Sequence, residues 1–375
     1  MFLKFTPTVF VIGKEYEILV NATEKGIFAV KIGGEFFYAE NSGVLSSEKT
    51  YAKIRVPQSA LDAAEKYEIV YKKTIDRKGY FSLMGEPQTA TFFFKPLKKT
   101  DNIHIYHIAD VHYNYETAAR TASYFGDDID LFVFNGDIGE VETEENYLET
   151  AKFTGEISQG KIPVVFTRGN HDTRGKLAEK YVEYFPADGQ NTYFTFKLGC
   201  INGVVLDCGE DKKDDHYDEQ YPNPWVYGGV NDFYSFRRRE YAWLQDVASQ
   251  KETRTFAICH IPLVRASEVQ GNVFDIEREL YQKMSLELEK LGIRFLLCGH
   301  MHRAYVLQPN DEKSFVKHAY PVIVGSELTK ETYDGGKVSV GQFIGTAITL
   351  KTNQTEVLFT NQNHKITGRF VLKNA

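Results

Sequence analysis

Short runs of alternating apolar and polar residues fill the first hundred residues, and this two-residue period predicts β-strands. The predicted strands are Ile27–Ile32, Glu35–Ala39, Tyr51–Val56, Tyr67–Tyr71 and Thr91–Phe94. Gly33 and Gly34 separate the first two strands and are typical of a hairpin turn. We find no convincing long amphipathic helix in this part of the chain.

Several short strands within about a hundred residues favour a small β-sandwich of immunoglobulin or fibronectin type III character. Pro96 and the lysines after it indicate the end of this sandwich. We therefore expect an N-terminal β-sandwich at residues 1–99 and a second domain at residues 100–375. The chain has 375 residues, which is long enough for one large and one small domain.

From residue 102 onward, apolar strands alternate with helical segments. The predicted strands are Ile103–Ala109, Leu131–Asn135, Pro163–Thr167, Tyr193–Lys197, Gly203–Asp207, Thr255–Cys259 and Phe295–Cys298. The predicted helices are Thr117–Phe125, Thr143–Gln159, Arg238–Val247 and Ile276–Leu291. This order is typical of an α/β fold with a mainly parallel, buried sheet. Candidates for a second sheet packed on the first are Tyr320–Val324, Gly345–Leu350, Thr355–Thr360 and Arg369–Leu372.

Polar clusters follow five of these strands. They are Asp110-Val111-His112, Gly136-Asp137, Gly169-Asn170-His171-Asp172, Cys259-His260 and Gly299-His300-Met301-His302. A single histidine at a strand end is usually a hydrogen-bonded loop residue, but five clusters in one order are not explained in that way. Because ligands bind at the carboxyl ends of the strands in α/β folds, we expect these side chains to lie together. The clusters therefore predict a two-metal hydrolase site.

The residue types suggest how two metal ions would be shared. Asp137 is a good bridging carboxylate, and the alternate residues Asp110 and His112 can face one metal. His300 and His302 have the same spacing and can reach two different metals. Oxygen and nitrogen ligands without a thiolate suit manganese, iron, zinc or cobalt ions.

Composition limits the partners of the protein. The formal net charge is −7 and the isoelectric point is near 5.9, whereas a protein that coats nucleic acid usually has a basic excess. We expect the short basic runs Lys95–Lys99 and Arg237–Arg239 to be solvated surface. Bulk nucleic-acid binding is therefore disfavoured, whereas a small nucleotide substrate is not.

The first residues lack the basic start and long apolar core of a signal peptide. No apolar run approaches the ~20 residues of a transmembrane helix. The four cysteines form no disulfide framework, and we expect Cys259 and Cys298 to be small buried thiols. These features favour a cytoplasmic protein without a transmembrane segment, and they leave its oligomeric state open.

Together the five clusters resemble the signature of the calcineurin-like metallophosphoesterase superfamily, which reads D-x-H, G-D, G-N-H-[DE], a histidine and G-H-x-H. The match covers residues from about 103 to 303. The resemblance implies a four-layer α/β/β/α sandwich after the N-terminal β-sandwich. It also implies that one metal binds Asp110, His112 and His302, that the second binds Asn170, His260 and His300, and that Asp137 bridges the two.

Catalytic roles follow from the same resemblance. The histidine of G-N-H contacts the phosphate in this superfamily and protonates the leaving group, and this role passes to His171 with Asp172 as its orienting partner. Arg168 precedes that cluster, as in protein serine/threonine phosphatases, where the arginine grips the phosphate. A guanidinium suits bidentate phosphate binding, although a structural ion pair is an equal alternative for Arg168.

A β-sandwich before the catalytic domain also resembles the purple acid phosphatases. Two positions depart from their pattern. Glu140 stands where those enzymes carry a tyrosine, and His112 supplies a histidine that they lack. We therefore expect a purple-acid-phosphatase-like arrangement without an iron–tyrosinate colour.

Three functions remain open. The favoured one is a dinuclear-metal-dependent phosphomonoesterase that attacks small-molecule or protein phosphoesters with a metal-bridging hydroxide. The second is a phosphodiesterase for nucleotide or phospholipid-type diesters, for which the aromatic stretch Trp225–Phe236 would offer stacking, although simple loop packing is the plainer interpretation. The third is a binding or scaffold protein with a vestigial metal site. We expect the acidic run Asp211–Glu219 to be a solvated loop.

Overall fold

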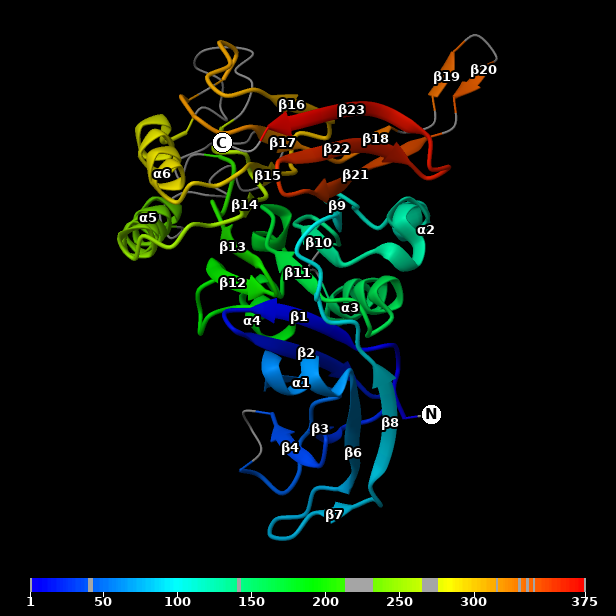
Figure 1. The fold of residues 1–375 in the computed structure, drawn as a ribbon. Coiled ribbons are helices and arrows are strands. Elements are labelled where there is room, and N and C mark those ends of the chain that lie inside the picture. The colour runs from blue at the N-terminus through cyan, green and yellow to red at the C-terminus, as the bar shows by residue number, and fades with distance from the viewer. Residues whose placement is uncertain are drawn as a thin grey trace, which may run out of the picture.

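The computed structural model of the protein describes residues 2–39, 43–139, 143–212, 232–264, 276–314, 316–329, 332–334, 337–339 and 341–373. Two large sheets form its centre, with helices on their outer faces (Figure 1). The α-helices are α1 (Gln58–Ala64), α2 (Tyr115–Ala122), α3 (Glu144–Ser158), α4 (Tyr181–Tyr184), α5 (Phe233–Ser249) and α6 (Arg278–Lys290). Among the described helices, none is both long and apolar enough to cross a membrane.

The first large sheet has ten strands in the order β23-β22-β21-β9-β10-β11-β1-β2-β5, with β18 paired to β21. Its strands are β1 (Thr8–Ile12), β2 (Glu15–Asn21), β5 (Tyr51–Pro57), β9 (Ile103–Ile108), β10 (Leu131–Asn135), β11 (Val164–Thr167), β18 (Glu327–Thr329), β21 (Gln342–Leu350), β22 (Gln354–Asn361) and β23 (Ile366–Lys373). The central strands β9, β10 and β11 run parallel, as the βαβ pattern predicts.

The second large sheet has six strands in the order β12-β13-β14-β15-β17-β16. Its strands are β12 (Phe194–Leu198), β13 (Ile201–Leu206), β14 (Phe256–Cys259), β15 (Leu296–Cys298), β16 (Tyr305–Leu307) and β17 (Val322–Val324). Strands β13, β14, β15 and β17 are parallel neighbours. Each large sheet therefore has parallel strands at its centre, flanked by antiparallel strands.

Three separate cores define four layers. Alternate strand residues such as Val133 and Val205 point between the two sheets and share one core. Their neighbours Phe132 and Val204 point outward, toward α2 and α3 in one case and toward α5 and α6 in the other. The two-residue period of each strand therefore gives both sheets a helix-covered outer face and a shared inner face. The expected α/β/β/α order is confirmed.

The N-terminal strands are divided between two sheets. Strand β1 pairs with β11 in parallel, so β1, β2 and β5 extend the first large sheet. A five-stranded sheet packs against this extension and consists of β3 (Gly26–Ile32), β4 (Glu35–Tyr38), β6 (Lys66–Asp76), β7 (Leu83–Met84) and β8 (Gln88–Phe93). One sheet of the N-terminal β-sandwich, formed by β1, β2 and β5, is therefore continuous with the large sheet that contains β9, β10 and β11. The division at residue 99 stays a prediction.

Three expectations are wrong in part. The C-terminal strands β21, β22 and β23 do not make a second sheet, because β21 pairs with β9 and extends the first. Helix α5 starts at Phe233, where the Asp232 side chain caps it by accepting from the Ser235 amide, and not at Arg238. Arg237 is fully buried rather than solvated, because its guanidinium donates to the Cys208 carbonyl oxygen.

A short hairpin of β19 (Thr332–Asp334) and β20 (Lys337–Ser339) stands apart from the two large sheets (Figure 1). Three 3-10 helices complete the described elements, at Ser123–Asp128, His171–Thr173 and Ala178–Lys180. The second of these begins at His171, four residues after the end of β11 at Thr167, and so belongs to the edge where the predicted ligands lie.

Candidate metal centre

The five predicted clusters follow β9, β10, β11, β14 and β15, and their loops are tied together by backbone contacts. The amide of Asp110 donates to the Gly136 carbonyl oxygen at 3.2 Å, which joins the loops after β9 and β10. The amide of His300 donates to Oδ2 of Asp110 at 2.8 Å, which joins the two large sheets. The carboxyl edges of both sheets therefore form one site.

The backbone at this site is strained. Five of the seven predicted ligands have a positive φ: Asp110 (54°), His112 (43°), Asp137 (54°), His300 (68°) and His302 (49°). A non-glycine residue rarely adopts this left-handed conformation, which costs of the order of 1 kcal/mol or more. Such strain is usually found where the fold must aim side chains at one point, and here it aims them at a shared centre.

Glycines let these strand ends approach closely. A Cβ on Gly136 would lie 2.5 Å from Nδ1 of His260, and one on Gly169 would lie 2.1 Å from Oδ1 of Asp137. A Cβ on Gly299 would lie 2.5 Å from the Cβ of Ala109. Gly136, Gly169 and Gly299 therefore each leave space for a residue that follows another strand.

Within the described residues, three groups of side chains bring their ligand atoms within 4.8 Å of one another, and all members are predicted site residues. The groups are Asp110, His112 and His302; His112, Asp137 and His171; and Asp137, His260 and His300. The first group equals the predicted ligand set of one metal. Asp137 belongs to both other groups, the position that a bridging carboxylate needs.

In both Asp110 and Asp137, one carboxylate oxygen accepts a hydrogen bond from a backbone amide, and the other oxygen lies near a histidine nitrogen. Asp110 accepts from the His300 amide with Oδ2, and its Oδ1 lies 3.4 Å from Nε2 of His302. Asp137 accepts from the His171 amide with Oδ1, and its Oδ2 lies 3.2 Å from Nε2 of His260. Asn170 adds a neutral oxygen, because its Oδ1 lies 2.9 Å from Nδ1 of His300.

Two of these atoms are buried without a hydrogen-bond partner in the part of the chain that the structure describes: Oδ1 of Asp110 and Nε2 of His260. A buried polar atom without a partner is costly, and a cation between the carboxylate and the imidazole would satisfy both. The donor set of carboxylate oxygens, one amide oxygen and imidazole nitrogens fits divalent or trivalent metal ions.

Two opposing effects set the pKa values in the cluster: burial, which disfavours the charged form of each side chain, and the neighbouring side chains of opposite charge, which favour it. Burial alone lowers the pKa of His260, but Asp137 and Asp110 outweigh it and raise that pKa to about 10. Burial raises the pKa of Asp137, but His260 outweighs it, so this carboxyl has a lowered pKa and stays ionised. Burial lowers the pKa of His300 to about 4, which leaves a neutral imidazole, the form that binds metals.

His171 lies at the more open side of the cluster. Its side chain is 36% exposed, and its Nε2 is 3.9 Å from Oδ2 of Asp137. Asp172 is buried, and its Oδ2 accepts from the amides of Gly169 (2.7 Å) and Asp137 (3.3 Å). Asp172 therefore ties the loops after β10 and β11 together, and its orienting action on His171 stays a prediction.

Arg168 makes the ion pair that was the alternative to phosphate binding. Its Nε lies 2.7 Å from Oδ2 of Asp207, and its guanidinium packs over the ring of Phe236 at 5.3 Å. The side chain is only 17% exposed. A phosphate contact of Arg168 stays a prediction.

Sequence reasoning missed three residues beside the cluster: Arg174, Glu210 and Asp211. The guanidinium of Arg174 binds the Glu210 carboxylate through Nε (2.7 Å) and Nη2 (2.5 Å), and its Nη1 is 3.2 Å from Nε2 of His171. Burial raises the pKa of Glu210 to about 7. The signal was present, because Glu210 and Asp211 follow the apolar strand β13 as the other clusters follow theirs.

Asp211 corrects the expectation of a solvated acidic loop. Its side chain is 7% exposed, and its Oδ2 lies 3.5 Å from Nε2 of His300. Burial raises the pKa of Asp211, but the hydrogen bonds with Glu210 and Lys212 and the positive charge of Lys212 outweigh it and lower the pKa. The rest of that run, Glu140 and the aromatic residues Trp225 and Tyr227 lie outside the described residues.

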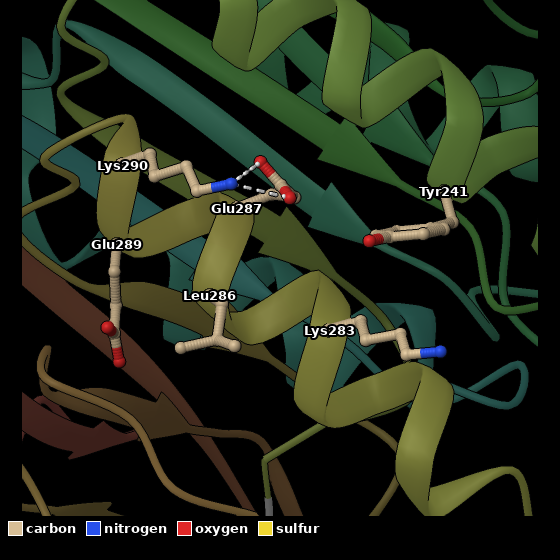
Figure 2. Close-up of a pocket in the computed structure, with 6 residues that line it drawn as sticks. All are labelled: Tyr241, Lys283, Leu286, Glu287, Glu289 and Lys290. Atoms are coloured by element: carbon tan, nitrogen blue, oxygen red, sulfur yellow. Dashed lines mark hydrogen bonds and ion pairs between the residues drawn. The ribbon is translucent and has the colours of Figure 1, made fainter.

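Cys259 and Cys298, which directly precede His260 and Gly299, are buried as expected. A separate surface pocket on α5 and α6 contains none of the predicted ligands (Figure 2). Lys290 and Glu287 form an ion pair there at 2.9 Å. The pocket is lined by Tyr241, Lys283, Leu286, Glu287, Glu289 and Lys290. Its side chains do not contribute to the cluster at the strand ends.

Comparison with known proteins finds a family match over the part of the chain that carries the predicted ligands. The family model described as calcineurin-like phosphoesterase matches residues 103–304. The serine/threonine-protein phosphatase CPPED1 of Danio rerio is 24% identical over 147 residues, which cover 38% of this chain and 42% of that protein. The human CPPED1 is 24% identical over 148 residues with the same coverage. The matched part thus spans about two fifths of the length of these relatives.

Two solved structures share the fold over 98% of this chain. The purple acid phosphatase PPD1 from yellow lupin (Lupinus luteus) seeds has a TM-score of 0.59 at 11% identity, and 74% of its chain is covered. PhoD has a TM-score of 0.57 at 10% identity, and 89% of its chain is covered. At these identities the likeness concerns the fold alone, and it includes the expected purple-acid-phosphatase-like arrangement.

Proposed function

The chain belongs to the calcineurin-like phosphoesterase family, and on this premise we propose that it is a metal-binding hydrolase of phosphoric ester bonds, specifically a dinuclear-metal-dependent phosphomonoesterase. The observation that carries the proposal is the convergence of the predicted ligands in three overlapping groups, with Asp137 in two of them. One metal would be held by Asp110, His112 and His302, and the second by Asn170, His260 and His300, with Asp137 between them.

A bound metal pair supplies positive charge that activates a water molecule and stabilises the phosphoryl oxygens. The ions are divalent or trivalent, and the donors suit manganese, iron, zinc or cobalt. Of the chain's own residues, His171 is the proposed proton donor to the leaving oxygen, because its side chain is 36% exposed and its Nε2 lies 3.9 Å from Oδ2 of Asp137. Asp172 holds the loop that carries His171.

Preference for a monoester is supported by positive charge near His171. A phosphomonoester carries one more ionisable oxygen than a diester and therefore gains more from cationic groups. Nη1 of Arg174 lies 3.2 Å from Nε2 of His171. Arg168 follows β11 next to the Gly169-Asn170-His171 cluster, and its guanidinium pairs with Asp207. The substrates to be tested include small phosphomonoesters and, because CPPED1 is called a serine/threonine-protein phosphatase, phosphorylated proteins.

The test is steady-state hydrolysis of para-nitrophenyl phosphate and of bis(para-nitrophenyl) phosphate with added manganese, zinc, iron or cobalt. We expect a higher kcat/KM for the monoester. A clear preference for the diester would replace the proposal with a phosphodiesterase. A protein that binds no metal and hydrolyses neither ester would favour a binding or scaffold protein instead.

Asp137→Asn tests the bridging role. The amide keeps the shape of the carboxylate but loses its negative charge and one acceptor oxygen, so we expect metal-dependent hydrolysis to fall at least about a hundredfold. Asp246→Asn, on the exposed face of α5, is the matched control and should keep wild-type activity. Intact hydrolysis by Asp137→Asn would contradict the dinuclear proposal.

A further inference from the structure

Asp211 faces the nitrogen of His300 that does not face the metal centre. Nδ1 of His300 lies 2.9 Å from Oδ1 of Asn170, on the side of the other predicted ligands of the second metal. Nε2 of the same ring lies 3.5 Å from Oδ2 of Asp211. The imidazole thus has one nitrogen toward the centre and the other toward a buried carboxylate.

A neutral imidazole carries its proton on one nitrogen and a lone pair on the other. A carboxylate is an acceptor only, so the nitrogen that faces Asp211 must carry the proton to interact favourably. Nδ1 then keeps its lone pair and faces the amide oxygen of Asn170, which is also an acceptor. Two acceptors at 2.9 Å repel each other unless a cation lies between them.

The surroundings of Asp211 hold its carboxylate in place. Oδ1 accepts from Nη2 of Arg174 at 3.0 Å and from Nζ of Lys212 at 2.8 Å, which leaves Oδ2 for His300. The backbone amide of Asp211 donates to Oε1 of Glu210 at 2.8 Å. Arg174 also donates to the Glu210 carboxylate, so one guanidinium binds both acidic side chains.

The sheet topology explains why this residue reaches the site. Asp211 follows β13, the parallel neighbour of β14, and β14 is the neighbour of β15. His260 follows β14 and His300 follows β15, so the three loops leave the same edge of one sheet. Asp211 therefore approaches His300 from the loop beyond that of His260.

We propose that Asp211 is a positioning residue of the metal centre, which keeps the proton of His300 on Nε2 and so presents Nδ1 to the second metal. The inference rests on the proposed function, because the second metal belongs to it. A carboxylate behind a ligating imidazole fixes its tautomer and ring orientation, and its loss typically weakens metal binding about tenfold to a hundredfold.

The first experiment titrates Mn²⁺ into the full-length, metal-free protein by calorimetry. Asp211→Ala should lower the affinity of one of two sites about tenfold to a hundredfold and leave the other unchanged. Asp211→Asn keeps an acceptor oxygen and should lose less than about threefold. Asp246→Ala, which removes an exposed aspartate of α5, is the matched control. Wild-type affinity for both ions in Asp211→Ala would overturn the proposal.

A second measurement needs no variant and therefore does not depend on the folding of Asp211→Ala. In the Zn²⁺-loaded wild-type protein, long-range proton–nitrogen spectra should assign the proton of His300 to Nε2. A proton on Nδ1 would overturn the proposal. Neither measurement requires turnover, so two ions bound in this way by a protein that hydrolyses no ester would support the role of Asp211 and overturn only the proposed phosphomonoesterase.

Discussion

Gly169→Ala should disable the metal centre through a single methyl group. A Cβ at this position would lie 2.1 Å from Oδ1 and 2.6 Å from the backbone nitrogen of Asp137. Ordinary contacts of a Cβ begin near 3.4 Å, so the Asp137 carboxylate or its backbone must move by more than about 1 Å. The same movement would break the 2.9 Å hydrogen bond from the His171 amide to Asp137.

The expected magnitude has two parts. Overpacking of a tightly packed site typically costs about 1–3 kcal/mol of folding free energy. Metal–oxygen distances tolerate only about 0.2 Å of error, so a bridging carboxylate displaced by more than about 1 Å no longer binds. We therefore expect a fall in metal affinity of at least about a hundredfold, together with a moderate loss of stability.

The assay combines metal titration with urea unfolding of the metal-free protein. Gly79→Ala is the control, because a Cβ there meets no atom within 4 Å. The control should change neither metal affinity nor catalytic activity. Gly169→Ala with wild-type metal affinity would refute the reasoning, because it would mean that the loops after β10 and β11 can separate without moving Asp137.

Two further changes should be visible in solution. Burial raises the pKa of Glu240 well above its ordinary value. The folded state therefore keeps a proton that the unfolded chain releases above pH about 4.3. Because of this difference, the free energy of unfolding falls as pH rises from about 4.3 toward the pKa of Glu240 in the folded state. This loss of stability amounts to at most about 1.4 kcal/mol per pH unit, and Glu240→Gln should remove it. Equal pH dependence of urea unfolding in the wild-type and Glu240→Gln proteins would contradict this prediction. Arg174→Ala removes the anchor of Glu210 and the neighbour of His171, so kcat/KM for para-nitrophenyl phosphate should fall about tenfold, whereas Arg120→Ala on the exposed face of α2 should not change it.

Much of the fold could be predicted because its strands bury both faces. The runs that become β10, β14 and β15 are apolar almost throughout, and β9 is apolar apart from His104 and His107. All four end at a polar cluster, so both the strands and the edge that carries ligands are visible in the sequence. The pairing of strands is not local information. Strands β21, β22 and β23 could equally have formed their own sheet, and only the contact of β21 with β9 decides that they extend the first.

Burial of charged side chains was the main property that the sequence concealed. Arg237 lies in a run of three arginines, yet it is fully buried against the carbonyl oxygen of Cys208 and the carboxylate of Glu277. Asp211 lies in an acidic run, yet it reaches His300. A charged residue is buried where a partner from a distant segment compensates it, and sequence separation hides such partners.

The sequence by itself determined which residues can serve as ligands and that they stand at strand ends, because both properties depend on residue type and on local periodicity. The tertiary structure alone decided which of their atoms face one another. It set left-handed backbone at five ligands, brought Gly169 against Asp137, and directed Arg168 to Asp207 and Arg174 to His171. These outcomes depend on the packing of two sheets, and the strands of these sheets come from distant parts of the chain that meet only in the folded protein.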